Sequence, residues 1–209
     1  MTLPFISVLI PTYGREKVLC DTITDVLNQT YDHYEVIEVD QTTHHEAETI
    51  AYLDAKANAE QIQWYQVPWA SLPGARNYGV RRAKGEIVLF IDDDVQITPD
   101  FLTAHAKNFA NPEVGAVAGR VFDRMKLSDL DPNLQIEYLP PQAMDPGIAW
   151  YHLNLVHTIK PQQVITARGC NMSFRRVLFD THNIWFDERF QGSAVREESD
   201  FCLRIRRTG

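Results

Sequence analysis

The chain has 209 residues, 44% of them hydrophobic and 23% charged, and carries a formal net charge of −8. This composition excludes a disordered chain, and the length is enough for a buried core and favours one domain over two small ones. The acidic balance disfavours nucleic acid as a partner, because phosphate binding needs clustered Lys and Arg, whereas the arginines here form short, scattered groups.

Strand and helix patterns alternate through the first half of the chain. In chain order we predict a strand at residues 5–10, a helix at 17–29, a strand at 35–39, a helix at 46–59, a strand at 62–67, a helix at 74–84, a strand at 87–91, a helix from an N-cap at Thr98 to about residue 111, and a strand at 114–122. This alternation indicates an α/β fold with an open, mostly parallel sheet flanked by helices. Because ligands of such sheets bind beyond the carboxyl ends of the strands, we expect residues 12–15, Asp40 and residues 92–94 along one edge.

The pattern breaks between residue 123 and about residue 163, where prolines, aromatic residues and histidines are mixed. Loops of this length are usually functional or mobile. Order returns at residues 164–167, followed by a turn at 169–171, a helix at about 173–181 and a final helix that starts at Glu197. The chain stops just after this last helix, which suggests a domain truncated at its C-terminus.

Cysteine usage and hydropathy bear on the cellular compartment. The three cysteines fit no zinc pattern, and their odd number argues against a disulfide framework, so we expect a reducing, cytoplasmic environment. Residues 1–11 are apolar but lack the features of a signal peptide, and no apolar run approaches the roughly 20 residues of a membrane-spanning helix. Attachment to the inner face of a membrane through a segment outside this chain stays open. The seven histidines show no metal-ligand spacing and are interpreted as surface or core residues.

The strongest chemical signal is the run Asp92-Asp93-Asp94, which directly follows the apolar strand at residues 87–91. Three adjacent carboxylates repel one another, and a fold gains nothing from placing them at the end of a buried strand. A hard divalent cation would balance them, since Mg²⁺ or Mn²⁺ is bound by one or two carboxylates together with substrate phosphates. The alternative is an acidic loop that caps helices, but the next helix already has a cap at Thr98.

Other families place acidic or glycine-rich motifs at strand ends, and the sequence disfavours each of them. A haloacid-type phosphatase would need Asp-x-Asp-x followed by Thr or Val, near the first strand, whereas Gln96 stands at that position after Asp92-Asp93-Asp94-Val95. A nicotinamide-binding unit would need Gly-x-Gly-x-x-Gly after the first strand, where this chain has Pro11-Thr12-Tyr13-Gly14-Arg15. Neither a phosphate loop that ends in Lys-Ser/Thr nor the Gly-x-Ser-x-Gly elbow of hydrolases occurs.

Four motifs, in order across nearly the whole chain, resemble those of family 2 glycosyltransferases with the GT-A nucleotide-sugar fold. They are ISVLIPTYGR at residues 6–15, VIEVD at 36–40, GARNYG at 74–79 leading to Asp92-Asp93-Asp94, and GCNMSFRR at 169–176 leading to EESDF at 197–201. The resemblance implies a Rossmann-like GT-A fold in one continuous domain. Residues 1–122 would form the half that binds the nucleotide-sugar donor, and residues 123–209 the half that binds the acceptor and carries the catalytic base.

For the donor, the resemblance implies a pocket along the strand ends. Its nucleotide-binding residues would be Pro11, Thr12, Tyr13, Arg15, Asp40, Arg76, Asn77, Asp92 and Asp93. Tyr13 could stack on the base, and Asp40 would accept the imide hydrogen of uracil, which favours a UDP-sugar; the alternative for Asp40 is a capping role at a strand end. Arg76 and Asn77 would lie near the diphosphate or ribose. The metal would be bound by Asp94, with Asp92 beside it, and would act as a Lewis acid on the leaving diphosphate.

On the acceptor side, the resemblance implies that Glu198 is the base that takes the proton of the acceptor hydroxyl in an inverting transfer. The family more often has Asp at this position, so Glu197 is the fallback. Acidic residues also suit a helix N-terminus through its dipole, which is the alternative for both. Gly169, Cys170 and Asn171 would form the turn on the acceptor side.

We therefore predict an inverting glycosyltransferase that uses a UDP-sugar and Mn²⁺ or Mg²⁺, with a glycan, a lipid-linked or another hydroxyl acceptor. The irregular segment at residues 123–163 is expected to shape the acceptor site or cover the donor. Two alternatives stay open. One is a truncated domain that binds nucleotide without turnover; the other, less favoured, is a sugar nucleotidyltransferase, which should carry a Gly-rich, basic loop after the first strand. The sequence does not reveal the sugar, the acceptor or the oligomeric state.

Overall fold

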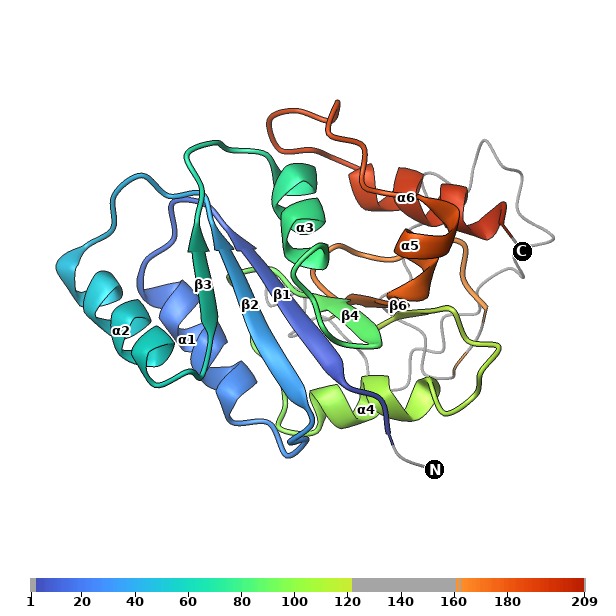
Figure 1. Cartoon of the computed structure of the whole chain (residues 1–209), viewed down its shortest axis with the longest axis horizontal. Coiled ribbons are helices and arrows are strands. Elements are labelled where there is room, and N and C mark those ends of the chain that lie inside the picture. The colour runs from blue at the N-terminus through green and yellow to red at the C-terminus, as the bar shows by residue number, and fades with distance from the viewer. Residues whose placement is uncertain (1–2, 122–160, 162, 209) are drawn as a thin grey trace, which may run out of the picture.

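Figure 1 shows a central sheet with helices on both faces, in a computed structural model that describes residues 3–121, 161 and 163–208. The strands are β1 (Ile6–Thr12), β2 (Tyr34–Asp40), β3 (Gln63–Gln66), β4 (Ile87–Phe90), β5 (Ala116–Ala118) and β6 (Met172–Arg175). They stand in the order β3-β2-β1-β4-β6-β5. β1 pairs in parallel with β2 and β4, and β2 with β3, whereas β6 runs antiparallel to both β4 and β5. The predicted α/β fold with an open, mostly parallel sheet is confirmed.

The helices in the described part of the chain cover the two faces of this sheet. They are α1 (Lys17–Leu27), α2 (Ala47–Asn58), α3 (Leu72–Val80), α4 (Phe101–Asn108), α5 (Val177–His182) and α6 (Glu197–Arg206). Side chains alternate between faces along a strand, so Val8 of β1 packs in the core formed with α1, α2 and α4, while Leu9 packs in the core formed with α3, α5 and α6 (Figure 1). None of these helices combines the length and apolar character needed to cross a bilayer.

The strand register brings the ends of β1, β2 and β4 to one edge of the sheet. Thr12, the last residue of β1, lies opposite Asp40, the last residue of β2. On the other side of β1, Leu9 lies opposite Phe90, so residues 92–94 extend past the end of β4 to the level of Thr12. The shared edge that we predicted from the sequence is therefore present.

The predicted helix at residues 173–181 is wrong at its start, because residues 172–175 form strand β6 and helix α5 begins only at Val177. β6 lies between β4 and β5 and pairs with both, and these backbone hydrogen bonds outweigh the local helical pattern. Its alternate residues Met172 and Phe174 are buried in one core, which is the period of a strand.

Helix α4 also differs from its prediction. It begins at Phe101 with Asp100 as the N-cap residue, and Thr98 instead donates its hydroxyl hydrogen to Asp100 Oδ1 at 2.6 Å. The predicted strand at 114–122 is reduced to the three residues of β5 within the described part of the chain. The irregular segment predicted at 123–163 lies almost wholly outside the described residues, as does the predicted division between residues 122 and 123.

Five phenylalanines anchor the second half of the chain to the sheet. They are Phe90 of β4, Phe174 of β6, Phe179 of α5, Phe186 and Phe201 of α6. The rings of Phe186 and Phe201 are stacked with their centroids 4.0 Å apart. This cluster holds α6 in place, with its N-terminus carrying the two candidate bases.

Candidate active site

Side-chain bonds join the segments that follow β1 and β4. Thr12 donates its hydroxyl hydrogen to Asp93 Oδ2 at 2.5 Å, and Arg15 Nε lies 3.3 Å from Asp93 Oδ1. Arg15 Nη2 also donates to Asp94 Oδ2 at 2.8 Å. Asp93 is buried, whereas the side chain of Asp94 is 44% exposed. Arg15, from the loop after β1, thus neutralises part of the negative charge of the three aspartates.

Asp92 faces a different arginine, Arg76 of α3. The side chain of Arg76 is only 2% exposed, and its Nη2 lies 3.7 Å from Asp92 Oδ1. The Nη1 atom of the same guanidinium is paired with Glu197 at the start of α6, which is also buried. The backbone of Gly169 lies against Arg76, so a larger side chain at residue 169 would displace the guanidinium. Arg76 therefore connects the aspartates after β4 to the N-terminus of α6.

Burial and crowding shift the protonation of these carboxyl groups. Burial raises the pKa of Asp92, Arg76 lowers it, and neighbouring carboxylates, Glu198 among them, raise it again. Burial also raises the pKa of Asp93, against an opposing hydrogen bond from Thr12. A positive ligand would favour the ionised form of both aspartates.

The two outer aspartates have the chemistry of a cation site. The side chains of Asp92 and Asp94 are 41% and 44% exposed, so both can offer oxygen atoms to a ligand. In the described part of the chain, no group of three or more His, Cys, Asp or Glu side chains is arranged to hold a metal. An ion that takes one or two carboxylates and completes its coordination with phosphate oxygens fits these residues, as Mg²⁺ does.

The predicted base-binding residue, Asp40, is buried and its carboxylate is already bonded. Oδ1 accepts from the backbone N–H of Thr42 at 2.8 Å, and Oδ2 accepts from Trp64 Nε1 at 3.0 Å and from His45 Nε2 at 2.9 Å. Since a carboxylate oxygen has two acceptor positions, Oδ2 is fully used and Oδ1 keeps one. The side chain has no exposed surface.

His45 lies between two carboxylates, a position that sequence reasoning missed. Its Nδ1 lies 3.2 Å from Glu16 Oε1, and its side chain is 1% exposed. Glu16 directly follows the loop of residues 12–15 and also accepts the backbone N–H of Glu46 at 3.1 Å. The sequence carries no signal for this contact, because it joins residues 29 positions apart.

Gln41 ties α3 to the same edge of the sheet. Its Nε2 donates to the carbonyl oxygen of Thr12 at 3.1 Å, and its Oε1 accepts the backbone N–H of Ser71 at 2.6 Å. Ser71 is the N-cap of α3, and its hydroxyl oxygen accepts from the backbone N–H of Gly74 at 3.1 Å. α3 therefore begins beside the strand ends and presents Arg76 to the aspartates.

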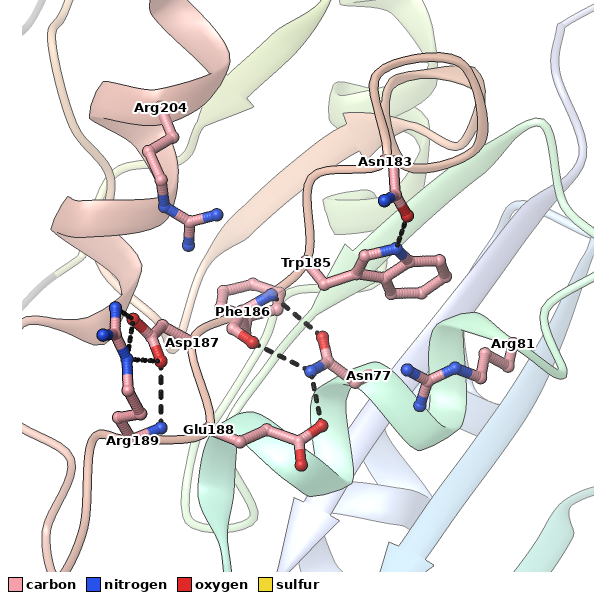
Figure 2. A pocket seen from close by; sticks show the side chains of 9 residues that line it. All are labelled: Asn77, Arg81, Asn183, Trp185, Phe186, Asp187, Glu188, Arg189 and Arg204. Carbon is pink, nitrogen blue, oxygen red and sulfur yellow. Dashed lines mark hydrogen bonds and ion pairs between the residues drawn. The ribbon is translucent and has the colours of Figure 1, made fainter.

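Asn77, the neighbour of Arg76, points toward the segment at residues 183–189 (Figure 2). Its amide donates to the carbonyl oxygen of Phe186 at 2.9 Å and to Glu188 Oε1 at 2.8 Å, and accepts the N–H of Phe186 at 2.9 Å. These residues border an open surface cavity of about 420 Å³. The structure thus brings Arg76 to the aspartates, but it engages Asn77 with the segment before α6.

The predicted acceptor-side turn lies between Arg76 and α4. Asn171 Oδ1 accepts from His105 Nε2 at 2.9 Å, and its Nδ2 donates to the carbonyl oxygen of Arg120 at 2.9 Å. Burial raises the pKa of Cys170 to about 11, so this thiol is protonated near neutral pH. These two residues shape the turn, while the third residue, Gly169, makes room for the guanidinium of Arg76.

The acidic residues that begin α6 differ in their burial and in their partners. Glu197 is buried against Arg76, whereas Glu198 is partly exposed. Asp200 is paired with Arg204 at 2.7 Å. The structure therefore separates the two candidate bases: Glu197 is buried and bound to Arg76, whereas Glu198 is partly exposed.

Comparison with known protein families and sequences points to one class. The model of the family described as glycosyl transferase family 2 matches residues 7–182. The chondroitin synthase of Escherichia coli is 26% identical over 234 residues, a match that covers 98% of this chain and 32% of the synthase.

Two solved structures share the fold. One is the mannosyltransferase PcManGT from Pyrobaculum calidifontis in complex with GDP-Man and Mn²⁺, with a TM-score of 0.68, 21% identity, and coverage of 98% of this chain and 52% of that one. The other is S. aureus TarS in complex with UDP, with a TM-score of 0.65, 19% identity, and coverage of 96% and 54%. The expected GT-A fold is confirmed. The chain spans less than two thirds of the length of each of these three proteins.

Proposed function

The chain belongs to glycosyl transferase family 2, and on that premise we propose that it is an inverting, metal-dependent enzyme that uses a UDP-sugar. One observation carries the proposal: the buried Arg76 is paired with Asp92 after β4 and with Glu197 at the start of α6, where Glu198 is the next residue. Inverting transfer needs a site for the leaving diphosphate and, across the reacting carbon, a base for the acceptor. These two groups of acidic residues supply both.

At the donor end, Asp94 and Asp92 would hold the cation, because both carboxylates are exposed at the strand edge. A bound divalent ion supplies Lewis-acid stabilisation of the departing diphosphate. Thr12 and Arg15 fix Asp93 between the two metal-binding residues. The GDP-Man and Mn²⁺ in the Pyrobaculum enzyme, and the UDP in TarS, support a nucleotide-sugar donor and a metal.

The acceptor position that remains on Asp40 favours uracil. Uracil offers one imide N–H, which needs a single acceptor, whereas guanine offers two neighbouring N–H donors that would pair with both oxygens of a carboxylate. Because His45 and Trp64 occupy Oδ2, Asp40 can accept one further hydrogen bond, at Oδ1. Tyr13 is 63% exposed and is available to stack on the base.

At the acceptor end, Glu198 would take the proton of the acceptor hydroxyl. The oxygen of that hydroxyl attacks the anomeric carbon from the face opposite the diphosphate, and the bond from this carbon to the diphosphate oxygen breaks. Glu197 would act through Arg76, to which it is bound, and so position the site. The similarity to a chondroitin synthase supports a glycan acceptor. A lipid-linked acceptor and attachment at a membrane face stay predictions.

Thermal shift with nucleotide tests the donor site and the base separately. UDP with Mn²⁺ should raise the melting temperature of the wild type, and Asp94→Ala should abolish this shift. The variant Glu198→Gln should keep the shift but release UDP from a UDP-sugar roughly 10²- to 10⁴-fold more slowly, the range for loss of a general base. Asp21→Ala, at an exposed residue of α1, is the matched control and should behave as wild type.

Three results would contradict the proposal. An undiminished shift in Asp94→Ala would remove this residue from the metal site. Full turnover in Glu198→Gln would move the base elsewhere. Stabilisation by GDP with Mn²⁺, but not by UDP, would refute the proposal that Asp40 binds uracil.

A further inference from the structure

His45 is the centre of a buried charged cluster at the edge of the donor pocket. Its Nε2 lies 2.9 Å from Asp40 Oδ2 and its Nδ1 lies 3.2 Å from Glu16 Oε1. An ionised carboxylate only accepts hydrogen bonds, so each ring nitrogen must carry a hydrogen for both bonds to form. The geometry is therefore that of an imidazolium bridging two carboxylates.

The charges around His45 support this protonation state. Burial lowers its pKa, but the hydrogen bonds and charges of Asp40 and Glu16 outweigh that effect, and the pKa of His45 is raised. The pKa of Glu16 is lowered, mainly by a hydrogen bond from the side chain of Thr49, so Glu16 stays ionised beside His45. Asp40 and Glu16 are the charged groups that act on His45; the other bonds to these carboxylates come from neutral donors, Trp64 among them.

The cluster links the parts of the chain that would contact a nucleotide. Glu16 directly follows Arg15, which is bonded to Asp93 and Asp94. Asp40 ends β2, and its Oδ2 is also held by Trp64 of β3. His45 thus connects the loop after β1, where the exposed Tyr13 lies, to the end of β2.

We infer that His45 is a positioning residue for the donor: as an imidazolium it holds Asp40 and the loop of Tyr13 and Arg15 in the arrangement that binds the nucleotide. This inference rests on the proposed function. When Nδ1 loses its proton, its lone pair faces the carboxylate of Glu16, and the link between the loop and Asp40 is lost. The contribution of His45 to binding is therefore complete below its pKa and disappears as pH rises through it.

Binding of UDP-glucose by the full chain, measured by calorimetry with Mg²⁺ at a series of pH values from about 6 to about 9, tests this inference. UDP-glucose is the probe because its diphosphate is esterified at both ends and has no proton to lose in this range. We expect the wild type to bind roughly tenfold more weakly at the highest pH, the effect of losing one charge-assisted hydrogen bond. His45→Gln should bind roughly tenfold more weakly at the lowest pH and show no such decline.

Two further variants separate positioning from a general loss of structure. His44→Gln changes the exposed neighbouring histidine and should keep the pH profile of the wild type. Glu16→Gln removes one of the two charges that raise the pKa of His45, so the decline in affinity should move to lower pH. Ionisation of Asp92 and Asp93 would raise the affinity as pH rises, because ionised carboxylates bind the cation better. This effect is common to all these variants.

The possible failures can be told apart. Wild-type affinity that does not fall anywhere in this pH series, or a profile of Glu16→Gln that does not move, would overturn the role of His45 and leave the proposed function intact. A wild type that binds no UDP-glucose at any pH of the series would overturn the proposed donor, and the role of His45 with it. If His45→Gln does not fold, the shift in Glu16→Gln decides the question.

Discussion

Arg15, Arg76 and His45 each pair with carboxylates at the donor edge, but Glu38 of β2 has no such partner. Its side chain is fully buried, and neither carboxyl oxygen has a hydrogen-bond partner. Burial, and then the charges of Asp40 and other carboxylates, raise the pKa of Glu38 well above its ordinary value. A buried carboxyl group without a partner costs free energy whether it is protonated or ionised.

Glu38→Met should therefore stabilise the protein, by about 1–3 kcal/mol, because an apolar side chain of similar size replaces an unsatisfied polar group. Folded Glu38 holds its proton to higher pH than unfolded Glu38, so unfolding releases a proton and the wild type loses stability as pH rises above about 4.5, the unfolded value. The variant should lose less over the same range. Urea denaturation at several pH values measures both effects. Glu48→Met, on the exposed side of α2, is the control. If the free energy of unfolding depends on pH in the same way in Glu38→Met and Glu48→Met, Glu38 is not the source of the effect.

At the scale of elements, α3 is the helix that connects the ligand-binding edge of the sheet with the segment before α6. Gln41 and the N-cap Ser71 set where it begins, Arg76 points to the aspartates, and Asn77 holds the segment that leads to α6. The two neighbouring residues face different partners because successive helix positions are rotated by about 100°. The position of one short helix therefore governs both halves of the site.

Ser71→Ala removes the side-chain cap of α3 and should lower the free energy of unfolding by about 1 kcal/mol, the usual effect of losing such a cap. Because Arg76 lies in the second turn of this helix, UDP affinity should fall as well. Urea denaturation and calorimetry measure the two effects. Ser193→Ala, at an exposed serine before α6, should change neither, and an unaffected Ser71→Ala would show that the cap does not control α3.

At the scale of the whole molecule, the two halves of the sequence share one sheet and one aromatic core. β6 lies between β4 and β5, so the second half pairs with the first through backbone hydrogen bonds. Phe201 of α6 packs on Phe186 and Phe174, and Phe174 in turn contacts Phe90 of β4. With this arrangement, α6 cannot move independently of β4, the strand that precedes the aspartates.

Phe201→Ala should destabilise the whole molecule by about 3–5 kcal/mol, the usual effect of truncating a buried phenylalanine. Unfolding curves followed by far-ultraviolet circular dichroism and by tryptophan fluorescence should stay superimposed, because the halves unfold together. Val177→Ala, at a residue of α5 that is 53% exposed, is the control. Two separated transitions in Phe201→Ala would show that the halves unfold independently.

The sequence by itself determined the alternation of strands and helices and the position of the acidic run. Buried parallel strands are continuous apolar runs, and the residues after them must lie at the edge where such sheets bind ligands. Asp92, Asp93, Asp94 and Arg76 were identified in this way or through the family motifs, and the structure brings them together.

Only the tertiary structure decided which charges meet. Thr12 and Asp93 are 81 positions apart, and Glu16 and His45 are 29 apart, and no local period of the chain records such contacts. For the same reason residues 173–175 were predicted to be helical: their strand conformation comes from the partners on either side. Local spacing is set by backbone geometry, but burial and pairing depend on which distant segments the sheet places side by side.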